Sequence, residues 1–336
     1  DSTEYTVYAV NVLNSIEPIV SIDDRTGRSD KALIRFIHAS PDAPAVDIKL
    51  NSGSDATVFS SAAFKDIEDY AAVDAGSYVF AVTPAGSNSE VAVFNPVDVQ
   101  NGSLYTVIAL GTLDANDQYP FIVRVFVDNG SGNASLDLSA GSSNVMVIHA
   151  SPDAPPVDLY VDDSKVNTNG LPFPQNTGYL TVSAGDRNFK VNAEGTATTV
   201  IDATSTLAPN GDYSVFAVDE LANIMPLVLE DDLSAPAAGK AHVRFIHLSP
   251  DAPEVDITLP DGTIVFGEYE FSEASAFTPL DAGMYDLEVR VSGTETVALN
   301  LDGINLESGV IYTVFAKGFL NGSGTQALGA EIIVNN

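Results

Sequence analysis

The chain has 336 residues, which is enough for two or three domains that each bury a core of their own. Its 14 Lys and Arg residues against 46 Asp and Glu residues give a formal charge of -32, which excludes nucleic acid as an expected partner because phosphate binding needs a basic surface. There is no cysteine, so disulfides, thiolate metal sites and cysteine nucleophiles are excluded, and no apolar run reaches the roughly 18 residues of a membrane span.

Residues 1–29 are predicted to form a pair of strands followed by a linker. Alternating apolar residues at Tyr5, Val7 and Ala9 indicate the first strand, and residues 19–22 indicate the second. The pair resembles the strand pairs that close the later repeats, so we interpret it as part of an incomplete repeat. We expect it to pack against a neighbouring repeat, or to take strands from another molecule that cover its open edges.

One ten-residue phrase, His-x-Ser-Pro-Asp-Ala-Pro-x-Val-Asp, then occurs three times. Each copy follows an apolar strand and precedes another, and a later strand in each repeat begins with Tyr-x-Val-x-Ala. The histidine that begins the phrase and the tyrosine that begins the later strand recur with nearly the same spacing. They are His38 with Tyr105, His149 with Tyr213, and His247 with Tyr312. Two markers that keep the same period indicate true internal repeats of domain size.

Each repeat contains about seven short strands separated by turn residues and no convincing helix, which is typical of a β-sandwich. We therefore predict an all-β protein of three tandem antiparallel, Ig-like β-sandwiches, arranged like beads on a string after the N-terminal strand pair. The predicted boundaries are 1–29 for the partial repeat and its linker, 30–128, 143–232 and 240–336 for the three repeats, and 129–142 and 233–239 for the linkers between them.

The repeated phrase reads as the end of a strand, a rigid turn and the start of the next strand. Ile34, Phe36 and His38 share one face of the first strand, so the imidazole should point towards the core. We predict that it is a buried hydrogen-bond bracket, because buried polar groups need partners. The alternative is a metal or catalytic site formed with Asp42 and Asp47. The structural motif comprises His38, Ser40, Asp42, Asp47, His149, Ser151, Asp153, Asp158, His247, Ser249, Asp251 and Asp256.

No catalytic residue is predicted, and we expect the protein not to be an enzyme. Ser40 is followed by proline and lacks the glycine-flanked elbow of a serine nucleophile. Catalytic triads also do not usually occur three times in one chain without an accompanying nucleophile.

The phrase, the Ala-Gly-x-Tyr strand start at residues 75–78 and the Tyr-x-Val-x-Ala strand resemble the family of secreted prokaryotic domains called domain of unknown function 4397. The resemblance covers nearly all of the chain as tandem copies. It implies a β-sandwich on an exported, often surface-attached repeat protein, and it implies no settled activity. The second repeat departs from the pattern, with Arg187 where the others have Tyr78 and Tyr285.

The function that these features favour is a non-catalytic extracellular or cell-surface scaffold, an adhesin-like interaction module of a prokaryote. Its ligand would be a protein or a polysaccharide on another surface, and the N-terminal strand pair could support self-association. The acidic surface suits a secreted protein, including one in marine or saline surroundings.

Two alternatives remain open. A calcium-dependent or calcium-stiffened module is suggested by acidic residues where the repeats join, since Ca²⁺ prefers such hard oxygen ligands, and no other cofactor is expected. The candidate ligands are Asp23, Asp24, Asp128, Asp231 and Asp232. A carbohydrate-binding accessory role is weaker, because the chain has no tryptophan to form a sugar platform.

Overall fold

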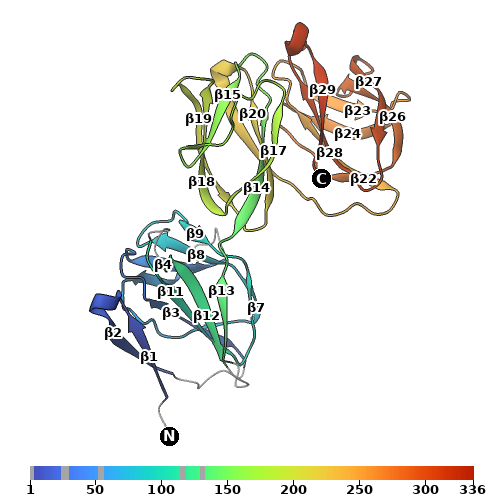
Figure 1. Ribbon diagram of the computed structural model, residues 1–336. Helices are drawn as coiled ribbons and strands as arrows, with labels where there is room; N and C mark the ends of the chain where they lie inside the picture. The colour runs from blue at the N-terminus through green and yellow to red at the C-terminus, as the bar shows by residue number, and fades with distance from the viewer. Residues whose placement is uncertain (1–3, 24–29, 52–56, 114–118, 129–132) are drawn as a thin grey trace. The chain divides into compact units, whose positions relative to one another are not determined.

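The structure is a computed structural model that describes residues 4–23, 30–51, 57–113, 119–128 and 133–336. In this part of the chain the elements are β-strands and short 3₁₀ turns, which confirms the all-β class (Figure 1). None of the helical turns described is long and apolar enough to cross a membrane. Contacts divide the chain into two compact units, one of residues 1–143, 183–187 and 205–210, and one of the remaining residues.

The first unit begins with the predicted strand pair, a hairpin of β1 (Tyr5–Val10) and β2 (Glu17–Ile22) joined through η1 (Leu13–Ser15). The two strands are antiparallel, with Val7 opposite Val20. The hairpin packs against the first repeat through Val10, which is buried together with Ile37 and Ile108. This contact agrees with the expectation that the partial repeat docks on its neighbour.

The strands of the first repeat are β3 (Ala32–His38), β4 (Val46–Leu50), β5 (Thr57–Ala62), β6 (Ala71–Val73), β7 (Gly76–Tyr78), β8 (Phe80–Pro84), β9 (Ala92–Val93), β10 (Val97–Val99), β11 (Leu104–Leu110), β12 (Ile122–Asp128) and β13 (Asn133–Leu138). They form a sheet in the order β13-β12-β11-β3-β6, a second sheet in the order β5-β4-β8-β9, and a small β10-β7 pair. Apolar residues of the two larger sheets, such as Phe36, Val107, Ile48 and Phe80, meet in one core.

One boundary prediction fails in this repeat. Residues 129–142 were expected to be a linker, but β13 lies within them and pairs along β12, with Leu138 opposite Val123. Leu138 is buried in the core of the repeat. The segment contains an alternating Leu136-Asp137-Leu138 pattern, and its neighbouring Gly, Ser and acidic residues obscured that pattern.

The second repeat contains β14 (Ser142–His149), β15 (Val157–Val161), β16 (Ser164–Lys165), β17 (Asn176–Ser183), β18 (Gly185–Ala193), β19 (Thr199–Leu207), β20 (Asp212–Val218), η2 (Leu221–Asn223) and β21 (Met225–Glu230). Its sheets have the orders β17-β14-β20-β21 and β16-β15-β18-β19.

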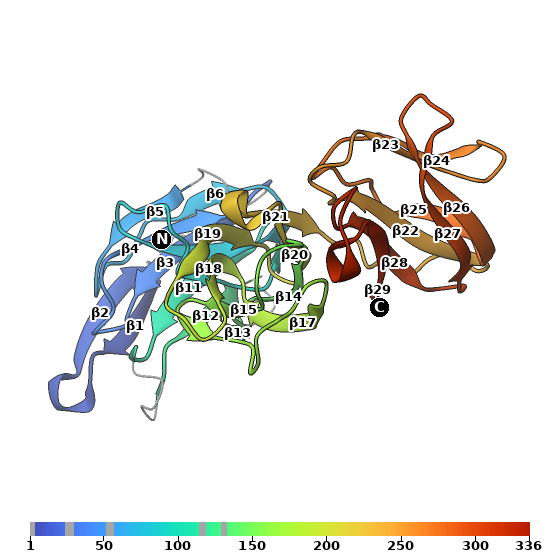
Figure 2. The same cartoon turned by 90° about the horizontal axis from the view of Figure 1, so that it is seen from above.

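The third repeat contains β22 (Lys240–His247), β23 (Val255–Thr258), β24 (Ile264–Tyr269), β25 (Thr278–Asp281), β26 (Gly283–Val291), β27 (Val297–Leu306), β28 (Ile311–Lys317), η3 (Gly324–Gln326) and β29 (Gly329–Val334). Its sheets have the orders β25-β22-β28-β29 and β24-β23-β26-β27, and Figure 2 shows β22 beside β28.

In each repeat one strand pair of the described residues runs parallel. The strand that leads into the repeated phrase runs parallel to the later Tyr-x-Val-x-Ala strand, as β3 with β11, β14 with β20, and β22 with β28. After the repeated phrase the chain continues in the opposite sheet. The strand before the phrase therefore does not pair with the strand that follows it, and its edge can pair with the later Tyr-x-Val-x-Ala strand, which runs in the same direction. Alternating apolar residues show which face of a strand is buried, but they do not reveal its direction.

The second and third repeats are not separate beads, because they share an apolar layer. Met146, Ile148 and Phe216 of the second repeat are buried together with Ile246 and Phe315 of the third. The rings of Phe216 and Phe315 meet edge to face with centroids 5.7 Å apart. These residues lie on the faces of the two sheets that point away from the cores of their own repeats, so the repeats pack back to back.

Candidate functional site

The three motif histidines occupy equivalent buried positions at the ends of β3, β14 and β22. Each is at most 1% exposed. The Nε2 atom lies 3.1 Å from the carbonyl oxygen of Pro44 in the first repeat, and 3.0 Å from those of Pro155 and Pro253 in the others. A carbonyl oxygen can only accept, so Nε2 carries the hydrogen and donates it. The imidazole therefore ties the end of a strand to the turn that follows it.

The other ring nitrogen supports the same neutral form. In the third repeat, Nδ1 of His247 accepts a hydrogen bond of 3.3 Å from the backbone N–H of Ser249. Burial lowers the pKa of His149 and of His247 below the ordinary value, and this effect outweighs the opposing bonds to the Pro155 and Pro253 carbonyls. These two imidazoles are therefore neutral at physiological pH.

In the first and third repeats the serine of the motif bonds the backbone of the loop after the closing strand, whereas the Ser151 hydroxyl of the second repeat is buried without a hydrogen-bond partner among the described residues. Ser40 Oγ donates to the carbonyl oxygen of Gly111 at 2.7 Å, and Ser249 Oγ donates to that of Gly318 at 2.6 Å. Both glycines have a positive φ, and an added Cβ would lie 2.3 Å from a backbone oxygen. The close approach of the two backbone segments explains why glycine stands at these positions.

The first aspartate of the motif bonds the same loop at a leucine. Asp42 accepts from the backbone N–H of Leu113 at 2.9 Å. The equivalent pairs, each at 2.7 Å, are Asp153 with Leu221 and Asp251 with Leu320.

The last aspartate of the motif holds two neighbouring loops. Asp47 accepts from the backbone N–H groups of Ser61 at 2.6 Å and Gly86 at 3.0 Å. In the other repeats Asp158 accepts from Gly195 at 3.0 Å and lies 2.7 Å from Lys165, and Asp256 accepts from Glu268 at 2.8 Å and Gly293 at 3.1 Å. This carboxylate points away from the apolar core, as expected, yet it is buried beneath the loops that it holds.

The contacts leave the motif little capacity for chemistry. The imidazole donates to a carbonyl, and in the first and third repeats the serine hydroxyl does the same, so neither forms the hydrogen-bonded pair that activates a nucleophile. Within the described residues no three His, Asp or Glu side chains are grouped to hold a metal ion.

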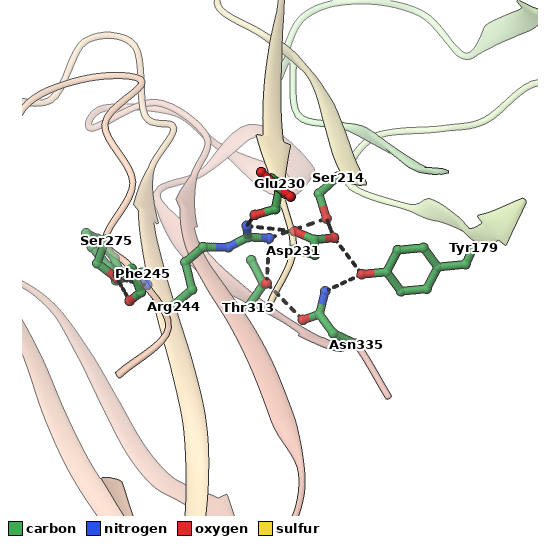
Figure 3. Close-up of polar contacts among 10 residues, drawn as sticks. Tyr179, Ser214, Glu230, Asp231, Arg244, Phe245, Ser275, Thr313 and Asn335 are labelled. Carbon is green, nitrogen blue, oxygen red and sulfur yellow. Dashed lines mark hydrogen bonds and ion pairs between the residues drawn. The ribbon is translucent and has the colours of Figure 1, made fainter. Parts of the chain in front are cut away.

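A second polar site lies between the second and third repeats, and the sequence did not predict it. Arg244 of β22 and Asp231, which follows β21, form an ion pair of 2.7 Å whose side chains are 3% and 0% exposed. Ser214 Oγ and the Tyr179 hydroxyl donate to the same carboxylate at 2.6 and 2.5 Å (Figure 3). Burial, together with the bond to Asp231, raises the pKa of Tyr179, so its hydroxyl stays protonated and donates.

The same arrangement recurs between the hairpin and the first repeat. Arg35 of β3 lies 2.6 Å from Asp23, which follows β2, and it also donates to the Tyr8 hydroxyl at 3.1 Å. Thr6 donates to Asp23 at 2.6 Å, as Ser214 does to Asp231. Each guanidinium also lies over an aromatic ring, Arg35 over Tyr70 and Arg244 over Phe277.

These contacts account for two of the proposed calcium ligands, since Asp23 and Asp231 have an arginine as their cation. Asp232 is exposed and accepts from the backbone N–H of Ser234 at 2.9 Å. Asp128 ends β12 with its backbone opposite Leu104, and Asp24 lies outside the described residues. The carboxylates proposed for calcium are therefore not brought together as one cluster in the part of the chain that is described.

The sequence held a signal for this site. Arg35 and Arg244 each stand three residues before a motif histidine, inside strands that are otherwise apolar, where a charge needs a partner. The second repeat has Met146 at this position, and Met146 lies in the shared apolar layer.

The buried motif and its recurrence define a tandem-repeat β-protein in which the same histidine–carbonyl hydrogen bond joins a strand to the following turn in each repeat. The chain belongs to the family described as Domain of unknown function (DUF4397), whose model matches residues 1–49, 32–139 and 143–258. No curated protein matches. Among solved structures, the Bacillus anthracis TIE protein is similar at 10% identity over 94% of this chain and 57% of its own, with a TM-score of 0.19. This chain thus spans little more than half of that structure, and so weak a likeness carries no argument.

Proposed function

We propose that this protein is a non-catalytic scaffold of the extracellular space or the cell surface, in which repeats combine into rigid back-to-back pairs. The observation that carries the proposal is the ion pair of Arg244 and Asp231, buried within the apolar layer that joins two repeats. A buried ion pair is poor evidence for stability, but its strict geometry can fix one relative position of the surfaces that contain it.

The contacts around the pair support this role. Thr313 accepts a hydrogen bond from Arg244 at 3.0 Å and donates one to Asn335 at 2.8 Å, and Asn335 donates to the Tyr179 hydroxyl at 3.1 Å (Figure 3). The network therefore crosses the boundary between the repeats at two residues of the third repeat, Arg244 and Asn335. Sliding of one sheet over the other would break several buried hydrogen bonds at once.

The repeated motif supports a structural role in a different way. Its imidazoles, carboxylates and most of its hydroxyls hold backbone groups, so the motif closes each repeat and leaves its outer surface free to vary. The high negative charge keeps such an array soluble and hydrated.

The hairpin offers a surface for association with another molecule. Tyr5, Val7, Val20 and Ile22 lie on its face away from the first repeat, and each is more than half exposed. The equivalent residues Tyr213 and Val215 are buried in the core of their own repeat. Contact of this face with a second copy of the chain would bury apolar side chains that the hairpin otherwise leaves in water.

Two measurements test the proposal. Protease treatment of intact producing cells should remove the protein from the cells while cytoplasmic markers stay intact. Single-molecule force spectroscopy on residues 144–336 in the full chain should show the second and third repeats unfolding in one event, because the apolar layer that they share must be separated before either repeat unfolds. Protection from the protease on intact cells would contradict the location, and two independent unfolding events that are unchanged in Arg244→Met would contradict the rigid pair.

A further inference from the structure

The first repeat contains a cavity that the second repeat lacks. The space between its two sheets has a volume of about 390 Å³, whereas the corresponding space in the second repeat measures about 30 Å³. The positions that line the two spaces match: Phe36, Ile48 and Val107 in the first repeat correspond to Val147, Leu159 and Val215 in the second. The void is therefore not a general property of the fold.

The cause is an interrupted edge strand. β9 has two residues and covers β8 only briefly before the chain pairs again at β10, whereas β19 and β27, at the same place in the other repeats, run without a break for nine and ten residues. Ala92 of β9 stands opposite Val82, and the matching pair in the third repeat is Leu299 opposite Val289. The first repeat thus has a small side chain where the third has a leucine, and Ala92 lines the cavity.

The lining is almost entirely apolar. Four phenylalanines, at positions 36, 80, 94 and 121, contribute to it, and among the described residues that line it only His38 has a polar side chain. The Nε2 hydrogen of that histidine is already donated to the Pro44 carbonyl. A space of this kind stays dry and favours an apolar guest, and aromatic walls favour rings and alkyl groups that meet their faces and edges.

The rim of the cavity is apolar and accessible. Val91 and Leu113 line the cavity and are also 55% and 53% exposed to solvent. Large apolar side chains that surround an opening are typical of a site that takes up ligand from water. The volume also falls within the range of roughly 300–1,000 Å³ found for small-molecule sites.

We infer that the first repeat binds an uncharged hydrophobic small molecule, with aromatic or alkyl groups held between its two sheets. The ligand carries no charge, because none of the described lining residues could neutralise one and the chain as a whole repels anions. The inference does not depend on the proposed scaffold function. It assigns to the first repeat a binding activity that the second repeat, whose corresponding space is filled, does not share.

Two dyes with the same ring system test this assignment. N-phenyl-1-naphthylamine is uncharged, and 1-anilinonaphthalene-8-sulfonate carries an added sulfonate. The full chain should bind the neutral dye at one site, at least about tenfold more tightly than the anionic one. Ala92→Leu fills the cavity as Leu299 fills the third repeat, and it should weaken binding of the neutral dye by about tenfold or more. Leu299→Ala disturbs the matching position of the third repeat and should leave the tight site intact.

A second measurement locates the dye even if Ala92→Leu fails to fold. The chain has no tryptophan, so a single introduced one is a clean reporter. Energy transfer to the neutral dye should be strong from Leu113→Trp at the rim of the cavity and weak from Leu320→Trp at the equivalent position of the third repeat. Absence of binding, equal affinity for the two dyes, unchanged binding by folded Ala92→Leu, or equal transfer from the two tryptophans would each overturn the inference.

Discussion

Arg244 and Asp231 form a salt bridge of 2.7 Å with both side chains almost completely removed from solvent, and Arg35 and Asp23 repeat it at 2.6 Å. In both cases the aspartate follows a closing strand pair and the arginine lies in the first strand of the next repeat. The two junctions are thus copies of one device, although one involves a complete repeat and the other only a hairpin.

Removing one partner of the buried pair should destabilise the second unit strongly. Arg244→Met leaves Asp231 buried without its cation, and we expect a loss of about 3–5 kcal/mol in the free energy of unfolding. The double variant Arg244→Met, Asp231→Leu should recover most of that loss, since Met146 shows that methionine suits this strand position. Urea denaturation of the three proteins measures both effects. A loss below 1 kcal/mol in the single variant would show that the pair is not effectively buried.

The motif histidines should make stability depend on pH above the range in which carboxylates titrate. Burial lowers the pKa of His149 and His247, so below the unfolded value of about 6.5 the unfolded chain takes up protons first. Their contribution to stability is complete above about pH 6.5 and decreases as the pH falls through and below that value towards their folded pKa values. Denaturation at a series of pH values between 7.5 and 5 should show this decrease.

Replacing both histidines by glutamine should reduce this pH dependence and cost about 1–3 kcal/mol for each domain at neutral pH. His242→Gln is the matched control, because His242 is the one histidine outside the motif. A pH dependence that survives the double substitution would show that other groups cause it.

The outer face of the hairpin should promote self-association. Val7 and Val20 face each other across β1 and β2, and both are more than half exposed. Val7→Asp should weaken association of the chain by about tenfold or more, because it places a charge in an apolar contact. Sedimentation at several protein concentrations measures the effect, and Val12→Asp, in the turn of the hairpin, provides the control. A chain that is monomeric at all concentrations would exclude this contact.

Calcium should have little effect on stability. Asp23 is partly buried, which opposes ionisation, but hydrogen bonds from Thr6 and Arg35 outweigh this and hold the pKa of its carboxyl below the usual range. The charge on Asp23 is therefore present and already matched by arginine. Thermal melting after chelation, with and without added Ca²⁺, should give the same midpoint, whereas a rise of several degrees on addition of Ca²⁺ would show a site that binds the folded state.

Much of the architecture could be predicted from repetition and alternation. The phrase at His38, His149 and His247 identified the repeats, and the apolar residues that alternate with each histidine indicated correctly that the ring is buried. The strand pair at residues 1–22 was recognised by its likeness to later pairs. These predictions succeed because burial of alternate residues is a local property of a strand.

Properties that depend on partners distant in the sequence were missed. The parallel pairing of β3 with β11 depends on where the chain returns after crossing to the other sheet. The role of Arg244 depends on contact between two repeats, which no pattern within one repeat contains. The cavity beside Ala92 was also not predicted, because it arises where an edge strand is interrupted, and the effect is visible only by comparison with Leu299 in the third repeat.

The residue three places before each motif histidine has a consequence for other arrays of these domains. In this chain arginine there belongs to the later member of each coupled pair, and methionine to the earlier member of the pair formed by the second and third repeats. If other arrays follow this rule, their repeats are coupled in twos, and the residue at this one position would show from the sequence alone which neighbouring repeats form a pair.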